Sequence, residues 1–525
     1  MHKSIIFSGE KMKKVLFFKN AAILTITSLI VRTVGIFFRI WLTGKIGAEG
    51  IGLYQVVFSV YVLATTFATS GICTAVTRIV AARFAENDGS GAKRAVKIAC
   101  ILSLIIAVIT MAAIFLFANF IAKYIIKDIR ATLSLKILCL GLPFIGICSC
   151  LRGYFLARRS TLPSSFSQIA EQIIRISVIV LLIGRTAPYG LEASAAAVMA
   201  GDGISEAAGA FCLYISYRLD SKKVKPNIKS KGGILKEILR ISVPISSGRY
   251  VHTTLRTAEN LLTPICFSKY KGTSLGGLEQ FGMIKGMALP LLMFPASILS
   301  SVSMLLVTEI TESAEKGNKK GIAISSEKVI YITSVFSFLI AGIFFSASGN
   351  IGQIVYKSKE VGYLIRAVSP LVPFMYLDLI CDGILKGLDS QKLLFMINVI
   401  DSAVRVVLVL VLVPMYGMTG FLGVMIFSNL FTSLAAVIKI VSCTGLKVSI
   451  KRCFLAPLFS VIVAVAVVGR FLVPISSDIV FTLASAIGIS AVYFFALYLQ
   501  NGGLGIDINF NKKHRYNKKR VTKNG

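Results

Sequence analysis

Long apolar stretches follow one another along nearly the whole chain. Runs of about 20 apolar residues, the length of a helix that crosses the hydrocarbon core of a bilayer, recur about fourteen times between residues 21 and 499. The polar segments between these runs are short, so they leave no room for a sizeable soluble domain. The pattern therefore predicts an all-α polytopic membrane protein with about fourteen transmembrane helices.

The second half of this pattern repeats the first. With a shift of 230 positions, four polar or small residues fall on similar ones: Gly153 on Gly383, Gln168 on Asn398, Glu171 on Asp401, and Arg175 on Arg405. Each repeat holds an even number of apolar runs, so both repeats have the same orientation in the membrane. We therefore expect two pseudo-symmetric six-helix lobes, related by an axis along the membrane normal, plus two extra C-terminal helices.

These patterns divide the chain into five parts. They are an N-lobe with helices 1–6 (1–217), a cytoplasmic linker (218–237), a C-lobe with helices 7–12 (238–440), helices 13 and 14 (441–500), and a basic cytoplasmic tail (501–525).

The charge distribution sets the orientation of the chain. Only 15% of the residues are charged and the mean hydropathy is +0.78, as in a membrane protein, although the net charge of +33 is typical of nucleic-acid-binding proteins. Successive connecting segments lie on opposite sides of the membrane. More than half of the 57 lysines and arginines fall in the segments of one side, the side that includes both termini. Such an excess of positive charge is typical of cytoplasmic segments. We therefore expect a multi-pass protein of the cell membrane with both termini in the cytoplasm. Membrane lipids are its expected partners and nucleic acid is not.

Two apolar runs carry an arginine pair. Arg32 and Arg39 lie seven residues apart, and Arg249 and Arg256 repeat this spacing 217 positions later. Seven residues are close to two helical turns, so each pair lies on one face, about 10 Å apart along the helix axis. An arginine within the bilayer costs several kcal/mol unless it meets water, a counter-charge or a ligand.

These arginines indicate a positively charged cavity that binds an anion. One guanidinium group can donate two parallel hydrogen bonds to two oxygens of the same phosphate, so a phosphate-bearing headgroup is the expected ligand. The predicted substrate-binding residues are Arg32, Arg39, Arg78, Arg249, His252, Arg256 and Lys285. The alternative is that arginines near the helix ends, Arg39, Arg78 and Arg256, extend to the membrane interface instead.

Other charged residues within the apolar runs come in pairs four positions apart. Glu171 with Arg175, and Asp401 with Arg405, are predicted to form structural ion pairs within their helices. The carboxylates Asp202 and Glu206 are candidates for binding an ion or a proton, with Glu206 the better one because it lies deeper. We expect no metal site and no cofactor.

Catalytic motifs are missing from the sequence. There is no P-loop, no G-x-S-x-G and no H-E-x-x-H segment. The sequence therefore predicts a transporter with no catalytic residues, rather than an enzyme.

Three stretches of the first half, residues 46–83, 151–178 and 188–206, resemble the stage V sporulation protein B family. Their distinctive segments are GAEGIGLYQ, RGYF and the S-Q-x-x-E-Q-x-x-R run. The family belongs to the polysaccharide-transporter branch of the multidrug/oligosaccharidyl-lipid/polysaccharide exporter superfamily. In the related lipid II flippases the first helix carries S-R-x-x-G-x-x-R. Here Arg32, Gly35 and Arg39 correspond to it, with the second arginine one position later and no serine immediately before Arg32.

The resemblance implies an alternating-access flippase for undecaprenyl-pyrophosphate-linked oligosaccharide, with a part in spore cortex or cell-wall peptidoglycan synthesis. It also implies that helices 13 and 14 form a groove for the lipid tail. We expect this chain to act as a monomer on a lipid-linked oligosaccharide. The alternatives are a multidrug cation antiporter of the same superfamily, and a membrane-embedded glycosyltransferase or ligase.

Overall fold

The computed structural model describes residues 2–224, 233–273, 275–446, 449–471 and 478–501 of the chain. Every regular element within these residues is an α, π or 3₁₀ helix and none is a strand, which confirms the predicted all-α class. Helices suit segments that meet lipid, because a helix satisfies its own backbone amides and carbonyls. Residues 225–232 of the predicted linker and 502–525 of the predicted tail lie outside the described residues.

Several helices are longer than one membrane crossing requires. Within the described residues, eight segments are long and apolar enough to cross a membrane, and ten if each of two bent pairs counts as one crossing. Helices α1 (His2–Thr69) and α15 (Gln391–Thr444) are each broken by a glycine with non-helical φ and ψ, at Gly47 and Gly417. Each of these two helices therefore consists of two helical segments, and the count of fourteen crossings stays a prediction.

The chain divides into two compact units. Unit 1 comprises residues Met1–Ser301 and Ser390–Thr432, and unit 2 comprises Val302–Asp389 and Ser433–Gly525. These limits differ from those expected for the two lobes, and the lobe boundaries stay a prediction.

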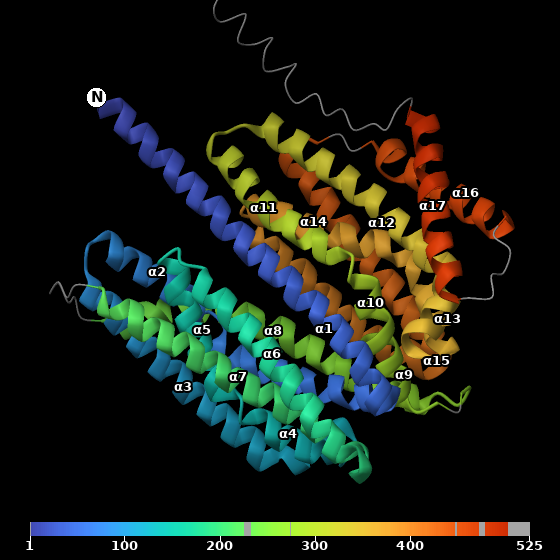
Figure 1. The fold of residues 1–525 in the computed structure, drawn as a ribbon, viewed down its shortest axis with the longest axis horizontal. Helices are drawn as coiled ribbons and strands as arrows, with labels where there is room; N and C mark the ends of the chain where they lie inside the picture. The colour runs from blue at the N-terminus through green and yellow to red at the C-terminus, as the bar shows by residue number, and fades with distance from the viewer. Residues whose placement is uncertain (1, 225–232, 274, 447–448, 472–477, 502–525) are drawn as a thin grey trace, which may run out of the picture. The chain divides into compact units, whose positions relative to one another are not determined.

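Unit 1 contains the first ten helices (Figure 1). Besides α1 they are α2 (Ile72–Ala85), α3 (Gly89–Phe120), α4 (Ala131–Cys139), α5 (Leu142–Ala157), α6 (Leu162–Thr186), α7 (Leu191–Lys222), α8 (Ile234–Lys269), α9 (Gly277–Phe281) and α10 (Leu289–Met293). Short π or 3₁₀ segments are η1 (Ile121–Ile126), η2 (Ala187–Tyr189) and η3 (Gly282–Ala288). Helices α11 (Ala296–Glu315) and α15 have residues in both units. A cluster of buried apolar side chains packs α2, α3, α5, α7 and α8 together.

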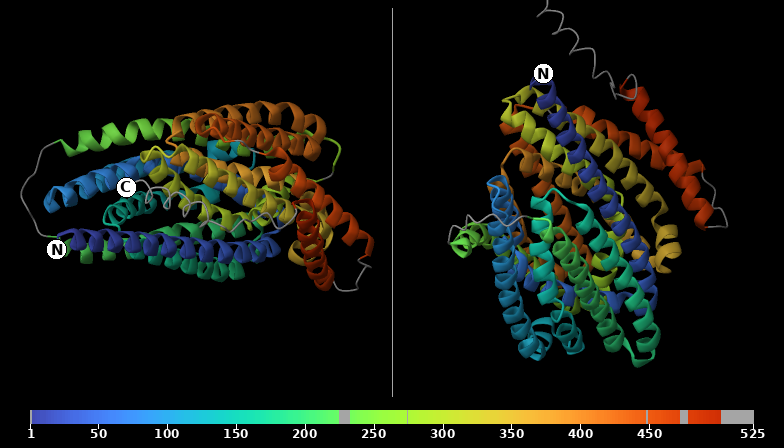
Figure 2. Two further views of the ribbon diagram at one scale, coloured as in Figure 1. Left: turned by 90° about the horizontal axis from the view of Figure 1, so that it is seen from above. Right: turned by 60° about the vertical axis from the view of Figure 1, so that its left-hand side comes forward.

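Unit 2 contains the remaining elements. They are α12 (Lys319–Tyr356), α13 (Lys359–Val368), η4 (Ser369–Leu371), α14 (Val372–Gly387), η5 (Lys451–Leu455), α16 (Ala456–Phe471) and α17 (Asp478–Asn501). The red helices α16 and α17 lie side by side (Figure 2), and both pack on α12. The buried Tyr493 of α17 fixes this packing, since its hydroxyl donates to the backbone carbonyl of Val335 at 2.9 Å.

Local geometry repeats at the 230-residue spacing found in the sequence. Lys127 and Lys357 each end a helix in the left-handed conformation, with φ of 63° and 53°. Asp88 and Asn318 each cap the next helix by accepting a hydrogen bond from a glycine amide three residues later, at 2.8 and 2.9 Å. The two halves thus begin and end helices with the same local devices, as a duplication would produce.

Close helix packing also repeats. A Cβ placed on Gly153 of α5 would lie 2.8 Å from the carbonyl oxygen of Cys73 on α2. A Cβ on Gly383 would lie 3.1 Å from the carbonyl oxygen of Ser303, which is 230 positions after Cys73. Glycine at these two positions lets helix backbones approach each other, as small residues do in membrane helix interfaces.

Gly153→Ala should therefore destabilise the protein by about 1–3 kcal/mol, because the new methyl group forces α2 and α5 apart. Gly184→Ala is the control, since Gly184 lies inside α6 with nothing within 4 Å of the new Cβ. Thermal unfolding of the purified protein in detergent measures both. Equal melting temperatures for Gly153→Ala and the wild type would contradict the close contact.

Candidate functional site

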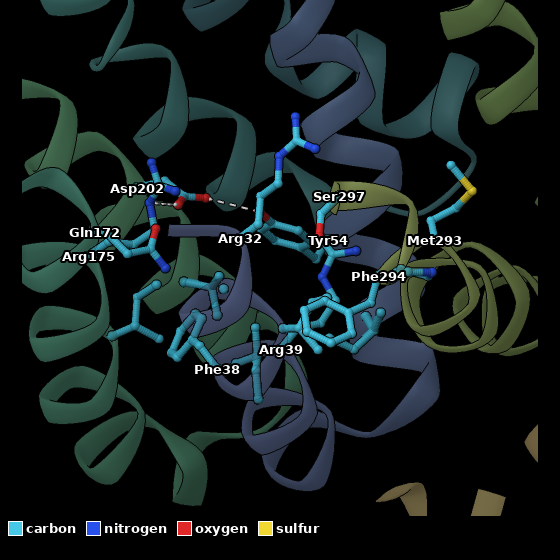
Figure 3. A pocket seen from close by; sticks show the side chains of 17 residues that line it. Arg32, Phe38, Arg39, Tyr54, Gln172, Arg175, Asp202, Met293, Phe294 and Ser297 are labelled. Carbon is cyan, nitrogen blue, oxygen red and sulfur yellow. Dashed lines mark hydrogen bonds and ion pairs between the residues drawn. The ribbon is translucent and has the colours of Figure 1, made fainter. Parts of the chain in front are cut away.

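A cavity of about 310 Å³ opens in unit 1 between α1, α6, α7, α10 and the start of α11. Its polar lining residues are Arg32, Arg39, Tyr54, Gln172, Arg175, Asp202 and Ser297. Figure 3 shows Gln172, Arg175 and Asp202 on one side of the cavity and Met293, Phe294 and Ser297 on the other. Three arginines face one carboxylate, so the lining is positively charged.

Arg32 and Arg39 come from the same face of α1, as their spacing predicted. Arg32 donates from Nη1 to the hydroxyl of Ser300 at 2.8 Å, which is a neutral partner. Among the described residues, neither arginine has a carboxylate within ion-pair distance. A ligand or water must therefore solvate these two charges in the membrane.

The third arginine of the cavity, Arg175, is held by an ion pair. Its Nε lies 3.0 Å from Oδ1 of Asp202 on α7, and Asp202 also accepts a hydrogen bond from the Tyr54 hydroxyl at 3.4 Å. A guanidinium nitrogen of Arg175 lies 3.8 Å from Oε1 of Glu206. The expected pair between Arg175 and Glu171 within α6 is therefore not formed.

Glu171 instead pairs with Arg152 of α5, at 2.6 Å, and accepts a hydrogen bond from Ser167 at 3.0 Å. Gly209 makes room for this arrangement, because a Cβ there would lie 2.1 Å from Oε1 of Glu171. The spacing of four residues placed Glu171 and Arg175 on neighbouring turns, but adjacent helices offer each side chain a better partner.

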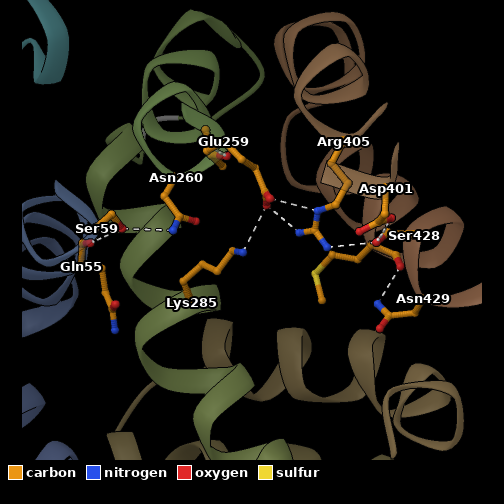
Figure 4. A network of polar contacts seen from close by, with 11 residues as sticks. Gln55, Ser59, Glu259, Asn260, Lys285, Asp401, Arg405, Ser428 and Asn429 are labelled. Carbon is orange, nitrogen blue, oxygen red and sulfur yellow. Dashed lines mark hydrogen bonds and ion pairs between the residues drawn. The ribbon is translucent and has the colours of Figure 1, made fainter. Parts of the chain in front are cut away.

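A second polar network lies elsewhere in unit 1 (Figure 4). Its centre is Glu259 of α8, whose carboxylate is 2.5 Å from a guanidinium nitrogen of Arg405 and 3.3 Å from Nζ of Lys285. Glu259 is only 2% exposed, so each of these bonds forms away from water. The buried Asp401 accepts a hydrogen bond from Ser428 at 2.6 Å, and Ser428 in turn accepts one from Arg405 at 3.1 Å. The pairing of Asp401 with Arg405 that we expected is thus replaced by a link through Ser428.

Five residues of the predicted cavity do not line the one that contains Arg32. They are Arg78 of α2, Arg249, His252 and Arg256 of α8, and Lys285 of η3. Lys285 contacts Glu259 instead, and Arg78, Arg249 and Arg256 are exposed on their helices. The half-buried His252 has an Nε2 atom without a hydrogen-bond partner. A substrate-binding role for these five residues stays a prediction.

Sequence reasoning missed several polar residues of the cavity. Tyr54 and Gln172 line it, and Arg175 was assigned a structural role only. Gln172 stands three positions before Arg175, so the same helical face of the S-Q-x-x-E-Q-x-x-R run carries both. From this spacing, Gln172 and Arg175 could have been predicted to line the same side of a binding site. Nothing in the sequence places Tyr54 beside Asp202.

Comparison with known proteins identifies related chains. The family model described as "Polysaccharide biosynthesis protein" matches residues 17–307. The stage V sporulation protein B of Bacillus subtilis (strain 168) is 24% identical over 416 residues, covering 78% of this chain and 80% of that protein. The lipid II flippase MurJ of the same organism is 23% identical over 519 residues, covering 91% and 94%. These matches confirm the resemblance found in the sequence.

Solved structures share the fold. A lipid II flippase MurJ in an inward closed conformation aligns with a TM-score of 0.70 at 14% identity, covering 91% of this chain and 98% of that one. An inward-facing multidrug resistance transporter of the MATE family aligns with a TM-score of 0.61 at 15% identity, covering 80% and 97%. The chain is thus a multi-pass membrane protein with a transporter fold, and the roles named for its relatives are those of a lipid II flippase and a multidrug transporter, not of enzymes.

Replacing Glu259 tests the second network. Glu259→Gln leaves the half-buried Lys285 and Arg405 beside each other without their shared buried carboxylate, so it should destabilise the protein by about 3–5 kcal/mol. Thermal unfolding in detergent and the yield of monodisperse protein measure this, with the exposed Glu315→Gln as the control. A Glu259→Gln protein as stable as this control would mean that the network does not stabilise unit 1.

Proposed function

Because this chain belongs to the polysaccharide biosynthesis protein family, we propose that it flips an undecaprenyl-pyrophosphate-linked oligosaccharide across the cell membrane by alternating access. One observation carries the proposal. Arg32 and Arg39 belong to a helix of membrane length and line a cavity. Among the described residues, neither has a carboxylate within ion-pair distance. A pyrophosphate would supply the negative charge that these two guanidiniums lack.

The chemistry of the cavity favours a phosphate ligand. A guanidinium forms two parallel hydrogen bonds to phosphate oxygens, and such charge-assisted bonds are shorter and stronger than neutral ones. The lining contains three groups that only donate hydrogen bonds, Arg32, Arg39 and Arg175. Tyr54 and Gln172 can both donate and accept, and Asp202 is the one carboxylate in the lining. Tyrosine and amide groups also suit the hydroxyls of a sugar attached to the phosphate.

Unit 2 contains a separate apolar cavity of about 420 Å³ that suits a polyprenyl chain. Phe338 and Phe345 of α12, Pro373 of α14, and Val461 and Val465 of α16 are among its lining residues, all of which are apolar. A hydrocarbon chain that enters this cavity from the membrane exchanges lipid contacts for equally apolar protein contacts, so it meets no polar group there. Residues of α16, in the predicted helix 13, line this cavity, and none of α17, in the predicted helix 14, does. The cavity therefore supports the helix 13 part of the expected lipid-tail groove.

The same observations weigh against a multidrug cation antiporter. A cationic drug needs carboxylates or an aromatic cage, and an excess of arginines repels it. The peptidoglycan precursor lipid II is the substrate named for one relative, and two relatives are sporulation proteins. Spore cortex or cell-wall precursors are therefore the oligosaccharides to test first.

Single substitutions Arg32→Ala and Arg39→Ala should reduce flipping about 10- to 100-fold, since each removes charge-assisted hydrogen bonds worth about 1.5–3 kcal/mol. The assay is transport of lipid II in proteoliposomes, at matched amounts of reconstituted protein. Arg185→Ala is the control, because Arg185 lies in the last turn of α6 and does not line the cavity. Flipping at the control rate in both cavity variants would refute the proposed substrate site.

The proposed orientation, with both termini in the cytoplasm, is tested separately. Fusing a reporter that is active only in the cytoplasm to the C-terminus should give activity, because the basic segments of the chain stay on that side. A reporter active only outside the membrane should be silent at the same place. The opposite result would reverse the orientation.

A further inference from the structure

Unit 1 contains a group of five neighbouring charged side chains on α5, α6 and α7, next to the cavity. They are Arg152 paired with Glu171, and Arg175 in contact with Asp202 and Glu206. The two sets meet where Glu171 and Glu206 have carboxylate oxygens within 4.8 Å of each other. Three carboxylates face two guanidiniums. The group therefore carries one negative charge in excess when all three carboxylates are ionised.

Glu206 is the carboxylate that the arginines hold least. Glu171 and Asp202 lie 2.6 and 3.0 Å from their arginine nitrogens, whereas Oε1 of Glu206 lies 3.8 Å from Arg175. Its Oε2 atom is buried and has no hydrogen-bond partner. An ionised carboxylate in this position has one buried oxygen without a hydrogen-bond partner and only a distant arginine at the other oxygen, which favours the neutral form.

The surroundings of Glu206 itself add hydrogen-bond donors, whereas the next cation on α1, Arg39, faces Asp202 in the cavity lining. From α1, Tyr61 is only 6% exposed and its hydroxyl has no partner. A Cβ built on Gly141 would lie 3.0 Å from this hydroxyl and 3.3 Å from the Cα atom of Gly203. Gly203 is one turn before Glu206 on α7, so the Tyr61 hydroxyl lies near this turn of the helix. From α5, the thiol of Cys148 lies 4.0 Å from the backbone carbonyl of Glu206.

The titratable groups of α4 are engaged elsewhere. Lys136 has its Nζ 5.6 Å from the centre of the Phe115 ring, and Cys139 donates to the backbone carbonyl of Lys136. The excess negative charge beside Glu206 is thus not cancelled from the fourth helix packed against α7.

A proton fits this site better than a metal ion does. Cys148, Glu171 and Glu206 place possible ligand atoms within 4.8 Å of one another. However, Oε1 of Glu171 already accepts bonds from Arg152 and Ser167, and a metal cation would lie against two guanidinium groups. The site also has no twin in the second half, where Thr432 and Ala436 stand 230 positions after Asp202 and Glu206.

Arg175 connects this site to the cavity, because it lines the cavity and also contacts Glu206. We propose that Glu206 takes up a proton when a phosphate-bearing ligand binds in the cavity, so that transport is coupled to protons through Arg175 and Asp202. The bound anion attracts Arg175 away from Glu206 and adds negative charge nearby, and both effects favour protonated Glu206. Linkage makes the effect reciprocal, so protonation of Glu206 strengthens anion binding. This inference rests on the proposed function.

Titration calorimetry of the full chain in detergent, with inorganic pyrophosphate as the probe, tests the coupling. Binding heats in two buffers of different ionisation enthalpy give the protons taken up on binding. The wild type should take up more protons than Glu206→Gln, which removes the site and leaves any uptake by the probe itself. Lowering the pH should strengthen binding to the wild type relative to Glu206→Gln, by about 5- to 150-fold. Glu192→Gln, an exposed carboxylate of the same helix, should behave as the wild type.

Infrared difference spectra of the wild type alone provide a second readout, which does not depend on the variant folding. Adding pyrophosphate should increase the absorption of protonated carboxylic acids.

The possible failures are distinguishable. No binding of pyrophosphate to the wild type would overturn the anion cavity and this inference with it. Binding with the same proton uptake in the wild type and Glu206→Gln, or with no infrared change, would overturn the proton site alone. Pyrophosphate binding that requires sodium and is independent of pH would also overturn it.

Discussion

A charge inside a membrane helix needs a counter-charge, water or a ligand, and this constraint organises the polar interior of unit 1. An unpaired charge at bilayer depth costs several kcal/mol, so its partner must lie within reach. Arg405 and Lys285 share Glu259, and Arg175 is bound by Asp202. Arg32 and Arg39 have no such partner among the described residues and face a cavity instead. The same constraint that stabilises the fold thus marks this cavity as the place where we propose that an anionic ligand binds.

Much of the fold follows from the sequence because its causes are local. Apolar runs of membrane length dictate helices, and the repeat of 230 residues recurs in the left-handed residues Lys127 and Lys357. The face of α1 that carries Arg32 and Arg39 follows from helical periodicity alone. The turns at Gly47 and Gly417 fall between consecutive apolar runs, where the division of the chain into fourteen runs predicts a break.

The ion-pair partners of the charged side chains could not be predicted from helical periodicity. A spacing of four residues shows which groups share a helix face, but it does not show which helix packs against that face. Glu171 and Arg175 were expected to pair with each other, and each pairs across to a different helix, with Arg152 and Asp202. Such contacts join residues 19 to 27 positions apart, and similar alternatives exist along each apolar run. Three-dimensional packing alone selects among them, so Arg175 was recognised as a cavity residue only in the structure.

The central claim is that the cavity containing Arg32 and Arg39 receives the phosphate groups of a lipid-linked oligosaccharide. The most direct test is a cryo-electron microscopy structure of the full chain bound to lipid II in a lipid nanodisc. The account predicts density for the pyrophosphate within hydrogen-bond distance of both arginines, since they line the cavity and have no carboxylate within ion-pair distance among the described residues. Pyrophosphate density elsewhere, with neither arginine in contact with it, would contradict the account.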